Sequence, residues 1–161
     1  MYFCLQDYIH LKGPNLEYVI FSAEDLVAKR YITAMMQKKM TFRTSEERRS
    51  AVAKIVREVD QLRAFFVRIA PDISSRANSS LEAIVASAEV LKNDDLEILS
   101  LDLHMLVDRF PDITEDHLFR LLMLRGDVNK SDIREKVSYV RQSSNRSKVS
   151  TPSKSIFHQI P

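Results

Sequence analysis

The sequence predicts an all-α fold, a helical bundle of about six helices joined by short corners. The 161 residues include two glycines, too few for the glycine-rich turns of β folds or of phosphate-binding loops. Apolar residues recur at the three- and four-residue spacing that lines one side of a helix. Prolines and capping residues separate these apolar runs. We therefore expect one helical domain.

The first part of the chain shows no convincing period. Residues 1–21 contain the turn signal Gly13-Pro14-Asn15, and we expect an irregular lead-in over this range. A helix is predicted from Ser22, which has Asp25 three residues on, to about Met40. The side chains expected to face inward are Leu26, Val27, Tyr31, Ala34 and Met35.

The longest predicted helix runs from about Ser45 to Ala70. Thr44 and Glu47 have the spacing of a capping box, in which a hydroxyl and a carboxylate satisfy free N–H groups of the first turn. Pro71 ends the helix. The residues expected to face inward are Val52, Ile55, Val56, Val59, Leu62, Phe66 and Ile69.

The stretch from Leu96 to Asp127 predicts two helices that meet at a corner. Pro111 stops the first helix, Thr114 can cap the second, and Gly126 is expected to close it in a left-handed conformation. Leu96, Leu99, Leu103, Leu106, Val107 and Phe110 form the predicted inner side of the first helix, and Leu118, Leu121 and Leu122 that of the second. Two short helices cannot cover each other's leucines, so we expect the other helices to pack on this pair.

Further helices are predicted on both sides of this pair. One runs from about Leu81 to Leu91, and another begins at Asn129 or Ser131 and fades near Arg141. The helical bundle domain is therefore expected to span residues 22–141. Residues 142–161 hold serines, prolines and basic residues without an acidic one, which predicts a disordered basic tail.

The net charge of +2 conceals an uneven distribution. Residues 29–57 hold nine basic and two acidic side chains, whereas residues 89–116 hold nine acidic and two basic ones. This pattern fits two solvated faces that keep neighbouring helices in register, and it equally fits a membrane or partner surface. Nucleic acid is not expected, because no aromatic stacking platform or recognition-helix pattern accompanies the basic residues.

Side chains with catalytic or metal-binding potential are few and scattered. The four histidines lie far apart without the spacing of a helical zinc site, and one cysteine cannot make an internal disulfide. Because no nucleophile–base pattern is present, we predict a protein that is not an enzyme and uses no metal or cofactor. The apolar start at residues 1–5 is too short for a signal peptide or a membrane span, so a cytoplasmic chain is expected.

Several ordered motifs resemble the carboxy-terminal part of the exocyst complex component 3 family. The resemblance covers about Asp7 to Val140, and the Pro-Asp-Ile corner and the Leu-Arg-Gly-Asp close are its most specific pieces. The matching segments are Met35–Lys39, Phe42-Arg43, Glu46–Arg48, Arg57-Glu58, Asp60–Arg63, Ala88–Val90, Phe110–Ile113, Asp116–Leu118 and Leu121–Asp127.

The resemblance implies the terminal segment of an elongated helical-rod tethering subunit of the exocyst. That complex tethers secretory vesicles to the plasma membrane before SNARE-driven fusion. The partners implied are other exocyst subunits and SNARE proteins, and the location implied is cytoplasmic and peripheral at plasma-membrane exocytic sites. The resemblance also implies a part or short form of a longer subunit, and it carries over no individual site residue.

An alternative function is binding to anionic membranes. The cations predicted to contact phosphoinositides, other anionic phospholipids or a protein partner are Lys38, Lys39, Arg43, Arg48 and Arg49. Each basic residue near an anionic surface contributes about 1 kcal/mol. A related exocyst-like branch of the family, which includes tumour necrosis factor alpha-induced protein 2, motivates this alternative.

Overall fold

The computed structural model describes residues 13–37, 40–70, 80–145 and 154–161. These residues form the α-helices α2 (Gly13–Gln37), α3 (Ser45–Ile69), α5 (Leu81–Glu89), α6 (Leu96–Arg109), α7 (Glu115–Leu122) and α8 (Lys130–Asn145) and the short 3-10 helix η1 (Ile156–Gln159). Within the described ranges there is no strand, and one isolated bridge joins Phe42 to Arg125. The predicted all-α helical bundle is confirmed.

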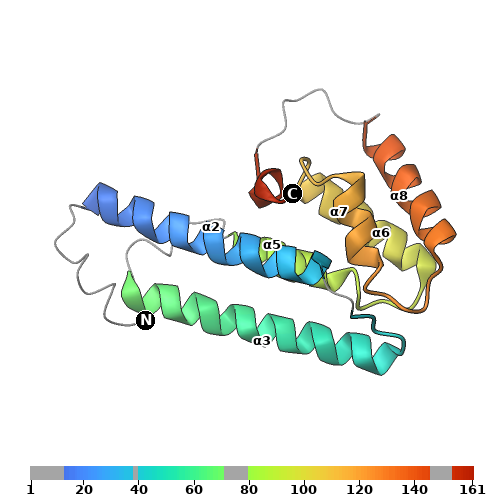
Figure 1. Ribbon diagram of the computed structural model, residues 1–161, viewed down its shortest axis with the longest axis horizontal. Helices are drawn as coiled ribbons and strands as arrows, with labels where there is room; N and C mark the ends of the chain where they lie inside the picture. The colour runs from blue at the N-terminus through green and yellow to red at the C-terminus, as the bar shows by residue number, and fades with distance from the viewer. Residues whose placement is uncertain (1–12, 38–39, 71–79, 146–153) are drawn as a thin grey trace.

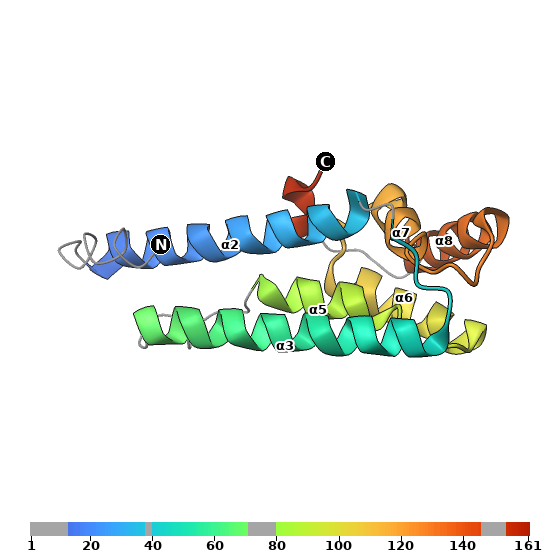
Figure 2. The same ribbon diagram turned by 60° about the horizontal axis from the view of Figure 1, so that its bottom comes forward.

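The helices form two groups, a rod and a head. In the rod, the long helices α2 and α3 run side by side in opposite directions, and α5 lies against both (Figures 1 and 2). In the head, α6 and α7 both pack on α8, while α7 and η1 also contact α2. The apolar side chains of both groups join in one continuous core.

The short helix α5 is the element around which the rod packs. Its small residues Ala83, Ser87 and Ala88 are completely buried, which lets the backbones of neighbouring helices come close. Glu82, on its exposed side, forms ion pairs with Arg63 of α3 and with Arg109 of α6. The expectation that the α6–α7 pair is the unit on which everything packs is therefore wrong for the rod.

Helix α2 differs from its prediction in both start and register. It begins at Gly13, so the irregular lead-in predicted for residues 1–21 is wrong from residue 13 onward, and residues 1–12 lie outside the described ranges. Pro14 is in the first turn, where a helix needs no N–H donor from it. Ile20, Ala28, Ile32 and Met36 are the buried apolar residues, while Leu26 is 55% exposed and its predicted inward position is wrong.

The starts of α3, α7 and α8 follow the predicted capping chemistry. Thr44 and Glu47 form the capping box of α3, and Thr114 accepts a hydrogen bond from the backbone N–H of His117 at 3.1 Å in α7. Asn129 accepts from the N–H of Asp132 at 2.9 Å just before α8. The predicted Val59 of α3, Leu103 of α6, Leu118 of α7 and Val140 of α8 are all buried.

The end of the chain contradicts the predicted disordered tail. Helix α8 continues to Asn145, and Ile156 and Phe157 of η1 are buried against the core. The Asp112 carboxylate accepts hydrogen bonds from the hydroxyl of Ser155 at 2.5 Å and from its N–H at 2.7 Å. The tail prediction is thus wrong for residues 142–145 and 154–161, and residues 146–153 lie outside the described ranges.

Candidate interaction site

The rod and the head meet where the segment before α3 passes the loop after α7. The N–H of Phe42 donates to the carbonyl of Leu124 at 2.7 Å, and the N–H of Gly126 donates to the carbonyl of Phe42 at 3.0 Å. A Cβ on Gly126 would lie 2.6 Å from Cγ of Arg43. The predicted left-handed closure is wrong, because Gly126 has no positive φ. Glycine is needed at this position because a side chain would prevent the close approach of the two segments.

Arg125 fills the inside of this joint. Its side chain is completely buried, and Nη1 donates to the backbone carbonyl of Asn93 at 2.6 Å. Nε and Nη2 donate to the carboxylate of Asp127 at 3.1 and 2.8 Å. A buried guanidinium is tolerated only when its donors are satisfied, and these contacts link the loop after α7 to the loop before α6.

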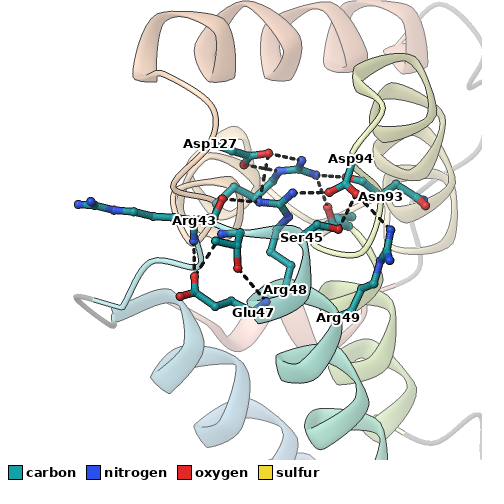
Figure 3. Close-up of polar contacts among 11 residues, drawn as sticks. Arg43, Ser45, Glu47, Arg48, Arg49, Asn93, Asp94 and Asp127 are labelled. Atoms are coloured by element: carbon teal, nitrogen blue, oxygen red, sulfur yellow. Dashed lines mark hydrogen bonds and ion pairs between the residues drawn. The ribbon is translucent and has the colours of Figure 1, made fainter.

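Arg48, in the first turn of α3, is the second buried arginine of the joint (Figure 3). Its side chain is 4% exposed and forms ion pairs with Asp94 and, at 3.2 Å, with Asp127. Nη1 also donates to the backbone carbonyl of Arg43 at 3.1 Å. We call Arg48, Arg125, Asp94 and Asp127 the arginine clamp. It ties the start of α3 to the α5–α6 and α7–α8 connections.

The clamp keeps its carboxylates ionised. Hydrogen bonds from Ser45 and Arg48 hold the pKa of Asp94 below the ordinary aspartate range. Burial opposes ionisation of Asp127, but the hydrogen bond and charge of Arg125 and the charge of Arg48 outweigh it and lower the pKa. The clamp is therefore fully charged at neutral pH.

The five cations predicted to contact a membrane or partner do not form one surface. Lys38 and Lys39 lie outside the described residues. The prediction is contradicted for Arg48, which is buried and paired inside the protein. Arg49 is exposed but pairs with Asp94 at 3.3 Å. Arg43 is exposed, so the available surface is smaller than the sequence indicated.

An open apolar cavity of about 520 Å3 lies between α2 and α3, next to the joint of rod and head. Apolar side chains of Met35, Met40, Phe42 and Ile55 contribute to its lining. At its polar edge, the Tyr31 hydroxyl donates a hydrogen bond to the Glu58 carboxylate. The pKa of Tyr31 is raised, mainly by burial and also by this hydrogen bond. A cavity of this size and lining suits apolar groups, and the hydrogen-bonded Tyr31–Glu58 pair offers a polar anchor at its edge.

The rings of His104 and His117 have structural partners. His117 is buried, and its ring accepts a hydrogen bond from the N–H of Thr114, completing the cap of α7, while Nε2 lies 3.2 Å from the carbonyl of Ile160. His104 joins α6 to α8 through Nε2, 2.6 Å from the hydroxyl of Ser143. Among the described residues, no group of three or more histidine, cysteine, aspartate or glutamate side chains is arranged to hold a metal ion.

No helix in the described ranges is both long enough and apolar enough to span a membrane. The exposed large apolar side chains are instead distributed over several helices, with the densest group, Ile98, Leu101 and Met105, on α6.

Sequence reasoning missed the clamp because its members are far apart in the chain. Arg48 and Asp94 come from the basic and acidic stretches respectively, so the opposite charge of those stretches was the available signal. Their pairing agrees with the interpretation that charges keep neighbouring elements in register. Nothing local to Arg48 indicated which carboxylates would meet it.

Comparisons with known proteins place this geometry in context. The family model described as exocyst complex component Sec6 matches residues 2–130. Exocyst complex component 3 of Drosophila melanogaster is 41% identical over 132 residues, covering 82% of this chain and 18% of that protein. Exocyst complex component 3-like protein of Mus musculus is 29% identical over 160 residues, covering 99% of this chain and 21% of the relative.

The same similarity extends to other animals. Exocyst complex component 3-like protein of Bos taurus is 31% identical over 128 residues, covering 80% of this chain and 17% of that protein. The chain thus spans about a fifth of the length of these relatives. No solved structure matches it.

Proposed function

The chain belongs to the exocyst component Sec6 family, and from that membership we propose that it acts as a non-catalytic helical scaffold in the exocyst. In this role it contributes protein surface to a complex that tethers secretory vesicles to the plasma membrane. Other exocyst subunits are its proposed direct partners, and SNARE proteins are a further class of partner. Its proposed location is the cytoplasmic side of exocytic sites.

The observation that carries a scaffold role is the arginine clamp. A scaffold must hold its surfaces at fixed angles, and flexible loops alone do not do this. Arg48 and Arg125 join α3, the α5–α6 connection and the α7–α8 connection through buried, charge-assisted hydrogen bonds. Such contacts add geometric specificity even where they add little net stability. The rod and the head are thereby kept in one arrangement.

Co-purification from animal cells tests this proposal. The tagged 161-residue chain is recovered from lysate after mild crosslinking, and exocyst subunits are measured individually against a tag-only control. We expect enrichment of at least one exocyst subunit over the tag-only control. Absence of every exocyst subunit, with a chain that circular dichroism shows to be folded, would contradict the proposal.

The lipid-binding alternative draws little support from the described residues. Arg48 cannot reach a lipid headgroup while it is buried, and Arg49 forms an ion pair with Asp94. Flotation with vesicles that contain phosphoinositides compares wild type with Arg43→Glu. Equal flotation of the two proteins is expected, whereas a clear loss for Arg43→Glu would favour the lipid alternative.

A further inference from the structure

Helix α6 is apolar on two opposite sides. Leu99, Leu103 and Leu106 face the core and are at most 3% exposed. Ile98, Leu101 and Met105 are 45%, 60% and 63% exposed. The spacing of these three residues places them on one face, away from the buried leucines. We call this outward row the α6 stripe.

The stripe is not a general property of helices in this protein. Helix α3 is longer, yet among its large apolar side chains Val67 is the one that is strongly exposed, at 49%. The rest of its outward face is mostly charged and polar, with exposed Lys54 and Asp60 among others. A helix that is apolar all round is normally covered, and a contiguous exposed apolar row marks an interaction site.

The charges around the stripe indicate what covers it. Asp94 is engaged by the clamp, but the sequence from Asp95 to Arg109 still holds four carboxylates and one arginine. Glu97 is exposed in the first turn beside Ile98, and Asp108 is exposed one turn after Met105. An anionic membrane or a second acidic helix would be repelled, whereas a partner with lysine and arginine beside its apolar face would be attracted.

We propose that the α6 stripe is the docking surface for a basic amphipathic helix of a protein partner. From Ile98 to Met105 the stripe is about 10 Å long, the length of two helical turns, so a partner helix of two to three turns covers it. The apolar side chains supply the contact, and the surrounding carboxylates select a cationic rim. We assign this partner to the exocyst, and that assignment rests on the proposed function.

A pair of synthetic helical peptides tests the surface directly. Both carry leucines at positions i, i+3 and i+7; one has lysines along the edges of that row and the other has glutamates. Fluorescence anisotropy measures binding to the full chain at rising salt. We expect the lysine peptide to bind about tenfold more tightly than the glutamate peptide, with the difference shrinking as salt screens the charges.

Matched protein variants separate the stripe from the rest of the surface. Leu101→Gln with Met105→Gln removes apolar surface without adding charge and keeps a good helix former at both positions. Val67→Gln makes the same kind of change on α3. The double variant is expected to lose at least about tenfold in affinity for the lysine peptide, while Val67→Gln binds like wild type. Hydrogen exchange on peptide addition is expected to slow in α6 and not in α3.

Several outcomes would overturn the inference. These are failure of the lysine peptide to bind wild type, equal binding of both peptides, or unchanged affinity in the double variant. Concentration-dependent dimerisation abolished by the double variant would assign the stripe to a second copy instead. Vesicle flotation abolished by it would assign the stripe to a membrane.

The two proposals can fail separately. If wild type recovers no exocyst subunit from cells, the proposed function fails, while the peptide titration still tests the stripe. If wild type recovers exocyst subunits and the Leu101→Gln, Met105→Gln variant recovers them equally, the stripe is not the surface that meets them.

Discussion

Helices α3 and α6 distribute charge in opposite ways. Helix α3 buries the charged side chain of Arg48 and presents a mainly charged outer face. Helix α6 buries leucines and exposes the apolar residues of the stripe. Buried charge is unfavourable unless it is paired, so its presence in α3 marks a place where orientation is specified. Exposed apolar surface in α6 marks a place where another protein is expected.

This contrast separates what stabilises the fold from what fixes its joint. Apolar residues of both helices contribute to one core, which provides most of the stability. The clamp fixes the orientation of α3 relative to the α5–α6 and α7–α8 connections. Each guanidinium has a fixed fork geometry, so its hydrogen bonds form in few relative positions of the partners. The two helices therefore respond differently to substitution, and the responses can be ranked.

The largest effect is expected on the buried side of α6. Leu103 is completely buried, and Leu103→Asp places an unpaired carboxylate in the core. A loss of about 4 kcal/mol or more would exhaust most of the stability of a small domain, so we expect an unfolded chain by circular dichroism. A cooperative melt equal to that of wild type would show that the inner face of α6 does not support the core.

The next effect is expected at the buried charge of α3. Arg48→Ala removes the cation between Asp94 and Asp127, and we expect a loss of about 2–3 kcal/mol in urea unfolding. This is below the cost of breaking a fully buried pair because both carboxylates are partly exposed. Arg49→Ala, on the exposed side, is the matched control and is expected to change stability by no more than about 0.5 kcal/mol.

Replacing Arg48 by methionine sharpens the same comparison. Met retains much of the aliphatic stem but no charge. If the clamp fixes the orientation of α3, Arg48→Met is expected to recover part of the stability lost in Arg48→Ala. It is not expected to restore native hydrogen-exchange protection in the loop after α7. Full recovery of both properties would mean that packing of the stem is the main contribution of Arg48.

A smaller, pH-dependent effect is expected in the head. Burial lowers the pKa of His117, so the unfolded chain binds a proton more readily than the folded one. The stability supplied by the neutral ring is complete above the ordinary histidine pKa of about 6.5 and is lost as pH falls below it. The clamp aspartates remain ionised there, because their pKa values are lowered.

Urea midpoints measured from pH 7.5 to 5 in about half-unit steps test this difference. Wild type is expected to lose stability toward pH 5, and His117→Gln is expected to show a shallower slope. The nearby charges of Arg120, Asp116 and Asp112 also act on His117, so ionic strength is kept constant. Identical slopes for the two proteins would exclude His117 as the titrating group.

The smallest stability effect is expected at Gly126. Gly126→Ala adds a Cβ 2.6 Å from Cγ and 3.3 Å from Cα of Arg43, so the two segments must separate slightly. We expect a loss of about 1–2 kcal/mol from this overpacking. In an Arg43→Ala background the close Cγ contact disappears, and the cost of Gly126→Ala should fall. An unchanged cost in that background would place the strain elsewhere.

Local signals predicted most of the fold. The Thr44 and Thr114 caps and the Pro111 corner each depend on residues within one or two turns. The two caps set the starts of α3 and α7, and the corner follows the end of α6. The start of α2 was available too, because a proline in a first turn is a start signal as well as a turn signal. Gly13-Pro14 begins the helix and is not a turn, so the nine residues from 13 to 21 are helical.

Long-range contacts account for what the sequence did not predict. The burial of Arg48 depends on Asp94 and Asp127, which come from two other connections of the fold. The end of the chain is ordered because Asp112 accepts three hydrogen bonds from Ser155 and His158, while Phe157 packs on Phe110. Composition alone underestimated this segment, because three of its apolar side chains are buried against the core: Ile156, Phe157 and Ile160.

A double-mutant cycle between Arg48 and Asp127 tests the central claim most directly, that paired charges fix α3 to the loop after α7. The free energy of unfolding is measured for wild type, Arg48→Ala, Asp127→Ala and the double variant. We predict a coupling energy of about 1–2 kcal/mol, because both residues belong to one hydrogen-bonded network. Additive effects within about 0.3 kcal/mol would contradict the claim.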